Sequence, residues 1–250
     1  MIVEKRPIQP LYTAGEWRQY LAVEAKRKFS PKEPSLALKP AYSNRPTHWA
    51  IRLPALALPG KHFDPREADD DPVAPQILIH KATEWDGVFK AGKSDPAAIK
   101  RSNQLLREMV ENQDPTKSPV FMDAELEFIS AKKTLRFSGG HGFRVLAQWN
   151  IEADVAREGR LHYLFLGISD DGSCQIVATF PIRLADLPKE DAANTTHLGF
   201  SMRPYIEFEK RFTAYRLAAK KWLAANADNA TPSLLELDQM ISSLVVRKWE

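Results

Sequence analysis

Two turn signals within residues 134–188 constrain the fold of this chain more than any other feature. One is the segment Ser-Gly-Gly-His-Gly at residues 138–142, and the other is the pair Asp171-Gly172. Alternating apolar and polar residues flank these signals, for example at residues 161–168 and 174–182. Glycine adopts positive φ angles without steric cost, and Asp-Gly is a preferred two-residue hairpin turn. The stretch therefore predicts consecutive β-hairpins, an antiparallel meander.

Helices are predicted before and after this meander. Pro96 suits the first position of a helix that extends to about Asn112. After Pro204, apolar residues at helical spacing run from residue 208 to residue 223. This helix is expected to cover one apolar face of the meander, made in part by Val145, Trp149, Tyr163, Phe165, Ile176 and Phe180. A last helix is predicted to start at Thr231-Pro232, with Ser233 and Glu236 in capping-box spacing. Its inward positions are expected to be Leu234, Leu237, Ile241, Leu244 and Val245.

The first sixty residues contain weaker signals. Thr13 can cap a helix that ends before Pro31. Residues 49–53 and 55–58 are strand-like but lie among several prolines, which cannot donate to a central β-ladder. We therefore expect an edge strand or an extended segment over the core.

On either side of the helix predicted from Pro96, residues 61–133 contain signals for a loop and for strands. Residues 61–75 predict a loop, and residues 76–80 predict a short buried strand that residues 85–89 could continue. Residues 120–128 alternate as in a strand with one wet face, while a helix over residues 124–133 is the competing interpretation.

The order of these elements predicts an α+β protein, an antiparallel β-meander packed against flanking helices that lie on one face. Regular βαβ alternation is absent, which argues against a doubly wound parallel sheet. We expect residues 1–117 to form a helical and extended, proline-rich region packed on the core. Residues 118–250 would form the sheet and two C-terminal helices, and one continuous domain is the alternative.

The composition is typical of a soluble globular protein, with 44% hydrophobic and 27% charged residues. No apolar run approaches the roughly 20 residues that a membrane-spanning helix needs. Charged residues near the start occupy the place of a signal peptide's apolar region, so we expect no export signal. Cys174 is the single cysteine, which excludes an internal disulfide, and its place in an alternating strand is typical of a small core residue.

Charge is distributed unevenly along the chain. Basic residues outnumber acidic ones in the first fifty or so residues, whereas residues 64–71 are acidic. Aromatic residues are interleaved with the basic ones: Trp17, Tyr20, Phe29, Tyr42 and Trp49. Such a segment could follow a phosphate backbone and stack on bases. We favour a solvated surface, because the net charge is only +3 and the aromatic spacing is irregular.

His141, Arg144 and Asp170 are the candidate binding residues, because they are expected at the hairpin corners. Successive N–H groups of residues 138–142 could hold an anion beside Arg144, and His141 could act as a general base or metal ligand. The segment beginning at Asp170 could start a calcium loop, but the remaining oxygen ligands do not follow. We favour plain hairpin turns in both places and expect no metal or cofactor.

Several short motifs lie in and after the central stretch. They are Phe137-Ser-Gly-Gly-His-Gly-Phe-Arg144, Gln148, Leu161-x-Tyr163-x-Phe165-Leu-Gly-Ile-Ser-Asp-Asp171-Gly172, Ala178-x-Phe180-Pro-Ile182, Leu187-Pro188 and Leu237-Asp238. Together they resemble a family of uncharacterised bacterial proteins, many of them exported or lipoprotein-anchored, with the text F-x-N-G-x-G-[IV]-R, Q-G-L-T-x-D-G, P-[IV] and L-P. The resemblance covers about residues 120–246 and implies a sheet-plus-helix domain without an established activity. The chain departs from it in the glycine segment, which lacks the usual Asn, at Leu166, where Gln is usual, and in the expected lack of a leader.

An enzyme hypothesis rests on Asp123 and Glu125, followed by the glycine segment. This order superficially resembles the acidic pair and SG-x-x-G-x-H strand of archaeo-eukaryotic primase-type nucleotidyltransferases, whose carboxylates hold divalent metal. Arg144 stands at the histidine position, and the interval from Asp123 to Ser138 is short for the helical insertion of such sites. No G-x-S-x-G elbow indicates a serine hydrolase.

The sequence thus favours a non-catalytic interaction or binding module, with a protein as the favoured partner. One alternative is a metal-dependent, primase-like nucleic-acid enzyme that uses Asp123 and Glu125. The other is a nucleic-acid-binding protein that uses the basic N-terminal segment. The compartment is left open by the sequence.

Overall fold

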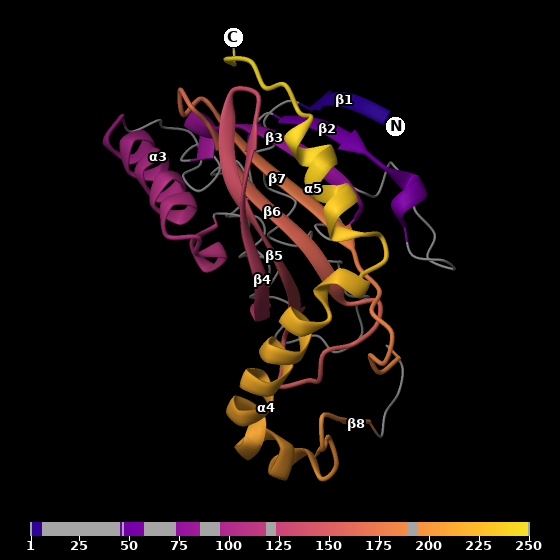
Figure 1. The fold of residues 1–250 in the computed structure, drawn as a ribbon. Coiled ribbons are helices and arrows are strands. Elements are labelled where there is room, and N and C mark those ends of the chain that lie inside the picture. The colour runs from indigo at the N-terminus through magenta and orange to yellow at the C-terminus, as the bar shows by residue number, and fades with distance from the viewer. Residues whose placement is uncertain are drawn as a thin grey trace, which may run out of the picture.

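The protein is built on a seven-stranded antiparallel sheet with the strand order β1-β2-β3-β7-β6-β5-β4 (Figure 1). The computed structural model describes residues 2–6, 46, 48–57, 74–85, 96–118, 124–189 and 195–249. The strands of the sheet are β1 (Ile2–Arg6), β2 (His48–Arg52), β3 (Gln76–Lys81), β4 (Glu125–Phe137), β5 (Gly140–Asn150), β6 (Leu161–Ser169) and β7 (Cys174–Pro181). Together with the helices they confirm the α+β class.

Both predicted hairpins are present. β4 and β5 pair from Glu125 opposite Asn150 to Phe137 opposite Gly140, and β6 and β7 are joined by the turn that contains Gly172. Residues 125–137 are a strand throughout, so the competing helix over residues 124–133 is wrong. Two register shifts interrupt β4, where Phe128 and Ala131 have positive φ angles. Bulges of this kind bend a strand and increase its twist.

The N-terminal strands join the same sheet through β3, which pairs with β7. β2 lies between β1 and β3, so the edge position predicted for residues 49–53 is wrong, and the outer strand is β1. Residues 55–58 do not form a strand, since a 3-10 helix occupies Pro54–Leu56. Trp85 does not continue β3 either, because it follows the 3-10 helix Ala82–Glu84 and is buried in the core. Residues 1–117 and 118–250 therefore both contribute strands to one sheet.

Helices cover both faces of the sheet, which corrects the prediction of a single covered face. α3 (Pro96–Glu111) places Leu106 and Met109 against one face, and α4 (Tyr205–Ala225) and α5 (Leu234–Ser242) pack on the other (Figure 1). Side chains alternate along β5, so Val145 and Trp149 belong to the α3 side rather than the α4 side. The central strands β6 and β7 are consequently buried along their whole length.

The helix boundaries follow the sequence signals closely. α3 starts at Pro96, α4 starts after Pro204, and α5 starts after Ser233. One predicted inward position differs, because Val245 is exposed, and Leu105 of α3 is exposed as well. The small hairpin of β8 (Thr196–His197) and β9 (Phe200–Ser201) packs beside α4, and further 3-10 helices lie at Pro115–Lys117 and Ala227–Asn229.

Several sequence predictions lie outside the described residues. These are the helix beginning at Thr13, most of the basic and aromatic segment before Trp49, the loop at residues 61–73, the continuation from residue 86 to 89, and Asp123. Among the helices in the described part of the chain, none has the length and apolarity needed to cross a membrane.

Candidate functional site

The structure brings together two of the three predicted binding residues and separates the third. His141 Nδ1 lies 3.5 Å from Asp170 Oδ1, and both side chains reach solvent in part. Arg144 is three residues along β5 and therefore points to the opposite face of the sheet. The three residues do not form one site, and a binding role for His141 and Asp170 stays a prediction.

Arg144 takes part in a buried polar cluster beneath α5. Asp238 of α5 accepts hydrogen bonds at Oδ1 from Arg144 Nε (3.2 Å) and from Tyr163 Oη (3.0 Å). Its other carboxylate oxygen, Oδ2, lies 2.9 Å from Lys133 Nζ. The guanidinium of Arg144 also donates to the carbonyl oxygen of Ala131. Burial and the nearby Asp238 carboxylate raise the pKa of Tyr163 above its usual range, so the phenol stays protonated and donates.

This cluster has a structural role, because its two buried charges, Arg144 and Asp238, are paired with each other inside the fold. Asp238 is only 4% exposed and Arg144 only 9% exposed, so neither side chain is presented to a ligand. Buried charges of this kind are tolerated when they are paired and hydrogen-bonded. The cluster therefore fixes α5 to β4, β5 and β6.

The glycine segment is explained by close packing against the C-terminal segment and β6. Gly139 has a φ of +89°, and a Cβ atom there would lie 2.3 Å from the carbonyl oxygen of Val246. A Cβ on Gly142 would lie 2.3 Å from the carbonyl oxygen of Leu166. Glycine allows both approaches because it lacks a side chain. These close approaches explain why glycine occupies both positions without any bound anion.

The second turn is held by its own side chains. Asp171 Oδ1 accepts hydrogen bonds from Ser169 Oγ (2.6 Å), from the Ser173 N–H (2.9 Å) and from Ser173 Oγ (2.8 Å). These bonds, that from Ser169 first, hold the pKa of Asp171 below its usual value. The described residues contain no group of three or more His, Cys, Asp or Glu side chains arranged to hold a metal ion.

The primase-like constellation is not assembled among the described residues. Glu125 pairs with Asn150 at one end of the β4–β5 hairpin, and Ser138 lies at the other end. At about 3.3 Å per residue, the two are separated by on the order of 35 Å along the strand. Asp123, the other carboxylate of that hypothesis, lies outside the described residues.

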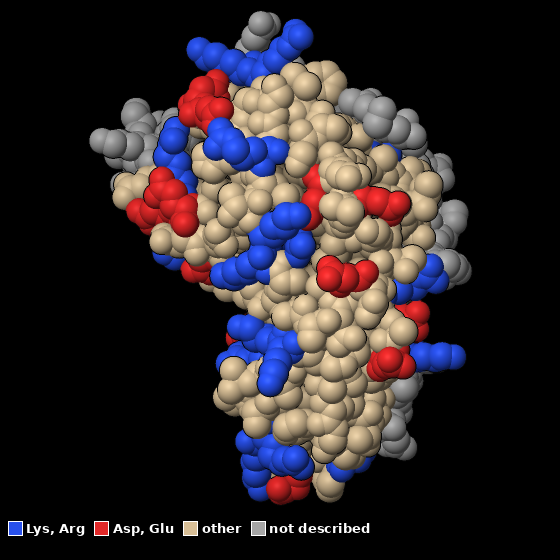
Figure 2. All heavy atoms as spheres, viewed as in Figure 1, with Lys and Arg blue, Asp and Glu red and all other residues tan. Residues whose placement is uncertain are grey.

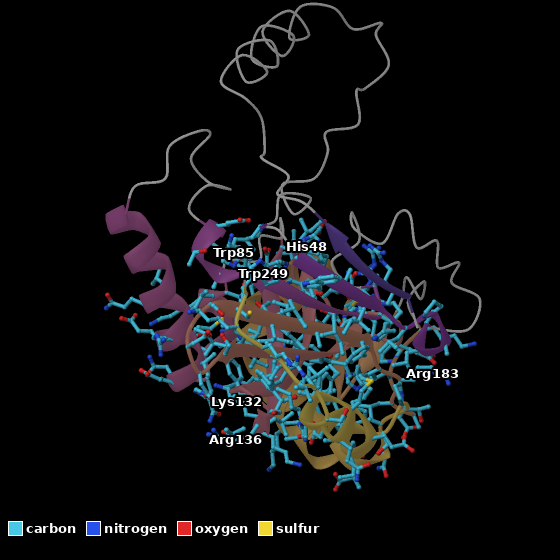
Figure 3. All side chains as sticks on the ribbon, turned by 90° about the horizontal axis from the view of Figure 1, so that it is seen from above. His48, Trp85, Lys132, Arg136, Arg183 and Trp249 are labelled. Atoms are coloured by element: carbon cyan, nitrogen blue, oxygen red, sulfur yellow. The ribbon has the colours of Figure 1, made fainter. Side chains whose placement is uncertain are left out.

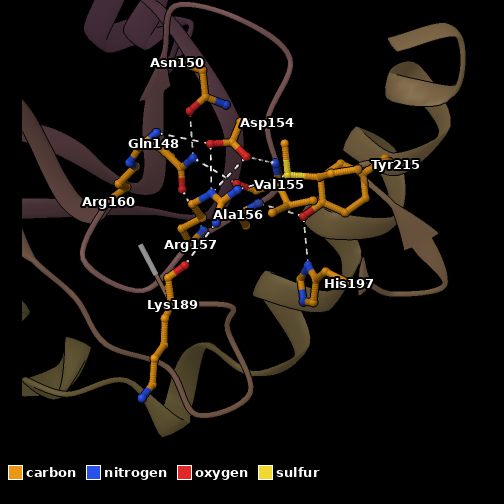
Figure 4. A network of polar contacts seen from close by, with 11 residues as sticks. Gln148, Asn150, Asp154, Val155, Ala156, Arg157, Arg160, Lys189, His197 and Tyr215 are labelled. Carbon is orange, nitrogen blue, oxygen red and sulfur yellow. Dashed lines mark hydrogen bonds and ion pairs between the residues drawn. The ribbon is translucent and has the colours of Figure 1, made fainter. Parts of the chain in front are cut away.

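A second polar network fixes the loop that follows β5 (Figure 4). Arg157 Nε lies 2.9 Å from both carboxylate oxygens of Asp154. Tyr215 of α4 accepts the Ala156 N–H at 2.7 Å, and its hydroxyl lies 2.8 Å from His197 Nδ1. Burial raises the pKa of Tyr215 and lowers that of His197. The network ties the loop to α4 and to the β8–β9 hairpin.

A groove of about 560 Å³ lies beside the C-terminal segment, residues 245–249. The sheet contributes Trp49 of β2, Ile79 of β3 and Cys174 of β7, and the C-terminal segment contributes the rest of the lining. Trp49 is 40% exposed, and Trp249 is partly exposed. Figure 3 shows Trp249 at the same end of the sheet as His48, the neighbour of Trp49, and away from Lys132 and Arg136 of β4. The lining residues thus place two indole groups at one opening.

The C-terminal segment is held at its two ends. The Ser138 N–H donates to the Leu244 carbonyl (3.0 Å), and the Val246 N–H donates to the Ser138 carbonyl (2.9 Å). Farther along, the Trp249 N–H lies 3.2 Å from Ser173 Oγ. The segment therefore runs from the turn of the β4–β5 hairpin to the turn of the β6–β7 hairpin.

The sequence did not reveal this groove. The sequence pattern groups Trp49 with the aromatic residues of the basic segment and predicts Val245 on the inner face of the last helix. One sequence signal of the groove is the segment Val245-Val-Arg-Lys-Trp249, in which apolar residues continue after the last helix has ended.

Comparisons with protein-family models, with curated proteins and with solved structures gave no match. The resemblance to the uncharacterised bacterial family stays a prediction. In the structure, two of its motif positions, Arg144 and Asp238, meet in the buried cluster under α5.

Proposed function

We propose that the protein is a non-catalytic binding module whose ligand-binding surface is the groove beside residues 245–249. The observation that carries this proposal is the exposed indole of Trp49 in a groove that Trp249 also lines. Its volume of about 560 Å³ lies in the range of ligand pockets. Tryptophan is enriched among the residues that dominate binding energy, because it offers a large contact area with few rotatable bonds.

The chemistry of the groove supports binding rather than catalysis. The thiol of Cys174 in its lining is buried, and burial raises the pKa of this thiol. A raised pKa disfavours the reactive thiolate. The other described lining residues are apolar or cationic, and none of them is a histidine or a carboxylate.

A nucleic-acid-binding role is the second candidate, because the basic residues near the start of the chain would favour it. On the face seen in Figure 2, however, the described Lys and Arg side chains form separate groups with Asp and Glu between them. A binder that follows a phosphate backbone needs a continuous basic path. Salt-sensitive binding of a single-stranded oligonucleotide that survives substitution of Trp49 would favour this role over the groove.

Selection from a random peptide library on the immobilised full-length protein tests the proposal. We expect enriched peptides that lose at least 10-fold in affinity for the variants Trp49→Ala and Val245→Asp. Leu217→Asp is the matched control, because Leu217 of α4 is as exposed as Val245 but lies outside the groove. Circular dichroism confirms that each variant is folded. Peptides that bind both groove variants as tightly as the original protein, or a library without enrichment, would refute the proposal.

A further inference from the structure

We infer that the groove takes an extended peptide in which acidic residues flank a large apolar side chain. This inference rests on the proposed function and names its ligand class. Three features carry it: the two indoles, the charge of the lining, and the main chain that forms one side of the groove.

All charged residues that line the groove are cationic. Arg247 and Lys248 are exposed, and no carboxylate belongs to the lining among the described residues. Asp171 is in electrostatic contact with Lys248, and its pKa is lowered first by the hydrogen bond from Ser169 and in part by this cation. The carboxylate oxygen Oδ1 of Asp171 is occupied by the hydrogen bonds of its own turn. The groove therefore favours an anionic ligand, because complementary charge speeds association and selects partners.

The C-terminal segment offers a peptide a strand-like partner. Ser138 bonds to the residues on either side of Val245, in the pattern of a parallel bridge. In such a bridge the N–H and C=O groups of the middle residue point away from the paired strand. A second extended chain can use groups of this kind while its side chains enter neighbouring pockets. Val245 is 67% exposed, so its surroundings are accessible.

These features distinguish a peptide from a fatty acid. A fatty acid would require a lining that is apolar along the whole acyl chain. Here the apolar positions Trp49, Ile79 and Val245 are interspersed with a polar main chain and two cations. One apolar side chain between the indoles, with carboxylates near Arg247 and Lys248, satisfies both kinds of group.

The test uses a fluorescein-labelled decapeptide in which aspartate and glutamate alternate with phenylalanine and leucine. Fluorescence anisotropy with the full-length protein measures its affinity against the same peptide with lysine in place of each acidic residue. We expect the acidic peptide to bind at least 10-fold more tightly, and the preference to shrink as salt is raised. The double variant Arg247→Glu with Lys248→Glu is expected to lose this preference.

Lys220→Glu with Lys221→Glu is the matched control, because it makes the same charge change at exposed positions on α4. We expect it to leave the preference intact. Equal binding of both peptides, with loss in Trp49→Ala, would overturn the acidic class while leaving the groove function standing. Binding of laurate without binding of either peptide would overturn the peptide class. Failure of both peptides, together with an unenriched library, would overturn the proposed function itself.

Discussion

The last seventeen residues of the described chain meet the sheet in two different ways. At Asp238 the contact is buried, and both carboxylate oxygens are hydrogen-bonded to side chains from β4, β5 and β6. From Val245 onward the contact is made mostly by main-chain bonds at the sheet's turns, and aromatic and cationic side chains reach solvent. The cluster around Asp238 stabilises the fold, but its hydrogen-bonding groups are already paired and are not accessible to a ligand. A ligand can instead bind at the segment from Val245 onward, where side chains are still exposed to solvent.

Asp238→Ala is expected to cause the largest effect and tests the first half of this comparison. The substitution leaves the guanidinium of Arg144 and the phenol of Tyr163 buried without their carboxylate, which typically costs about 3–5 kcal/mol. Urea unfolding followed by circular dichroism measures the change. Val245→Asp is the companion variant and is expected to change stability by less than about 0.5 kcal/mol. Comparable losses of stability in both variants would show that the two regions contribute equally to the fold.

The substitution Tyr215→Phe tests whether the second polar network, around Arg157 and Tyr215, also stabilises the fold. The substitution removes the acceptor of the buried Ala156 N–H and the hydroxyl beside His197. An unpaired buried donor costs about 1–3 kcal/mol, and we expect a loss in this range. Thermal unfolding at neutral pH provides the measurement. A loss well under 1 kcal/mol would show that the loop after β5 is held by other contacts.

The same network predicts a dependence of stability on pH. Burial holds the pKa of His197 below its ordinary value of 6.5, so the unfolded chain binds this proton at a higher pH than the folded chain does. The stabilising contribution is therefore complete above pH 6.5 and is lost as the pH falls below it. The groups that face the ring, Tyr215 and Trp222, are uncharged and do not offset the effect.

Urea unfolding at pH 7 and pH 5 measures this dependence, with His197→Phe as the comparison. The variant is expected to lose less stability between the two pH values than the original protein. An equal loss in both proteins would assign the pH dependence to other groups.

The smallest effects are expected at the hairpin corner and at the start of β4. His141→Ala and Glu125→Ala remove side chains that are partly or fully exposed, so each should change stability by less than about 0.5 kcal/mol. Peptide binding in the groove should also be unchanged. A loss of binding in His141→Ala would bring the predicted corner site back as part of the ligand surface. Mg²⁺-dependent nucleotide incorporation that Glu125→Ala abolishes would instead replace the binding-module proposal.

The sequence predicted those features that depend on local signals. The turns at Gly139 and Gly172 and the starts of α3, α4 and α5 all follow from glycine, proline or capping residues. The assignment of faces failed at Val145 because both sides of β5 are buried, so apolar character does not distinguish them. β1 was missed because a short outer strand has no alternation long enough to recognise.

The site was harder to predict than the fold, for a physical reason. The groove combines Trp49 with residues two hundred positions later in the chain, and only the pairing of β2, β3 and β7 brings them together. Arg144 was a reasonable candidate because an arginine near a glycine turn is often exposed. Its partner Asp238 belongs to a helix far along the chain, and no residue near Arg144 in the sequence predicts that contact.

The pairing of β3 with β7 also sets an order of events during synthesis. Gln76 lies opposite Thr179, so β3 has no native neighbour on that side until the chain through residue 179 has left the ribosome. The β4–β5 hairpin involves near neighbours in sequence and can form before β7 has been synthesised. The first half of the protein is thus completed by the second, and a truncation before β7 would leave the apolar edge of β3 open to aggregation.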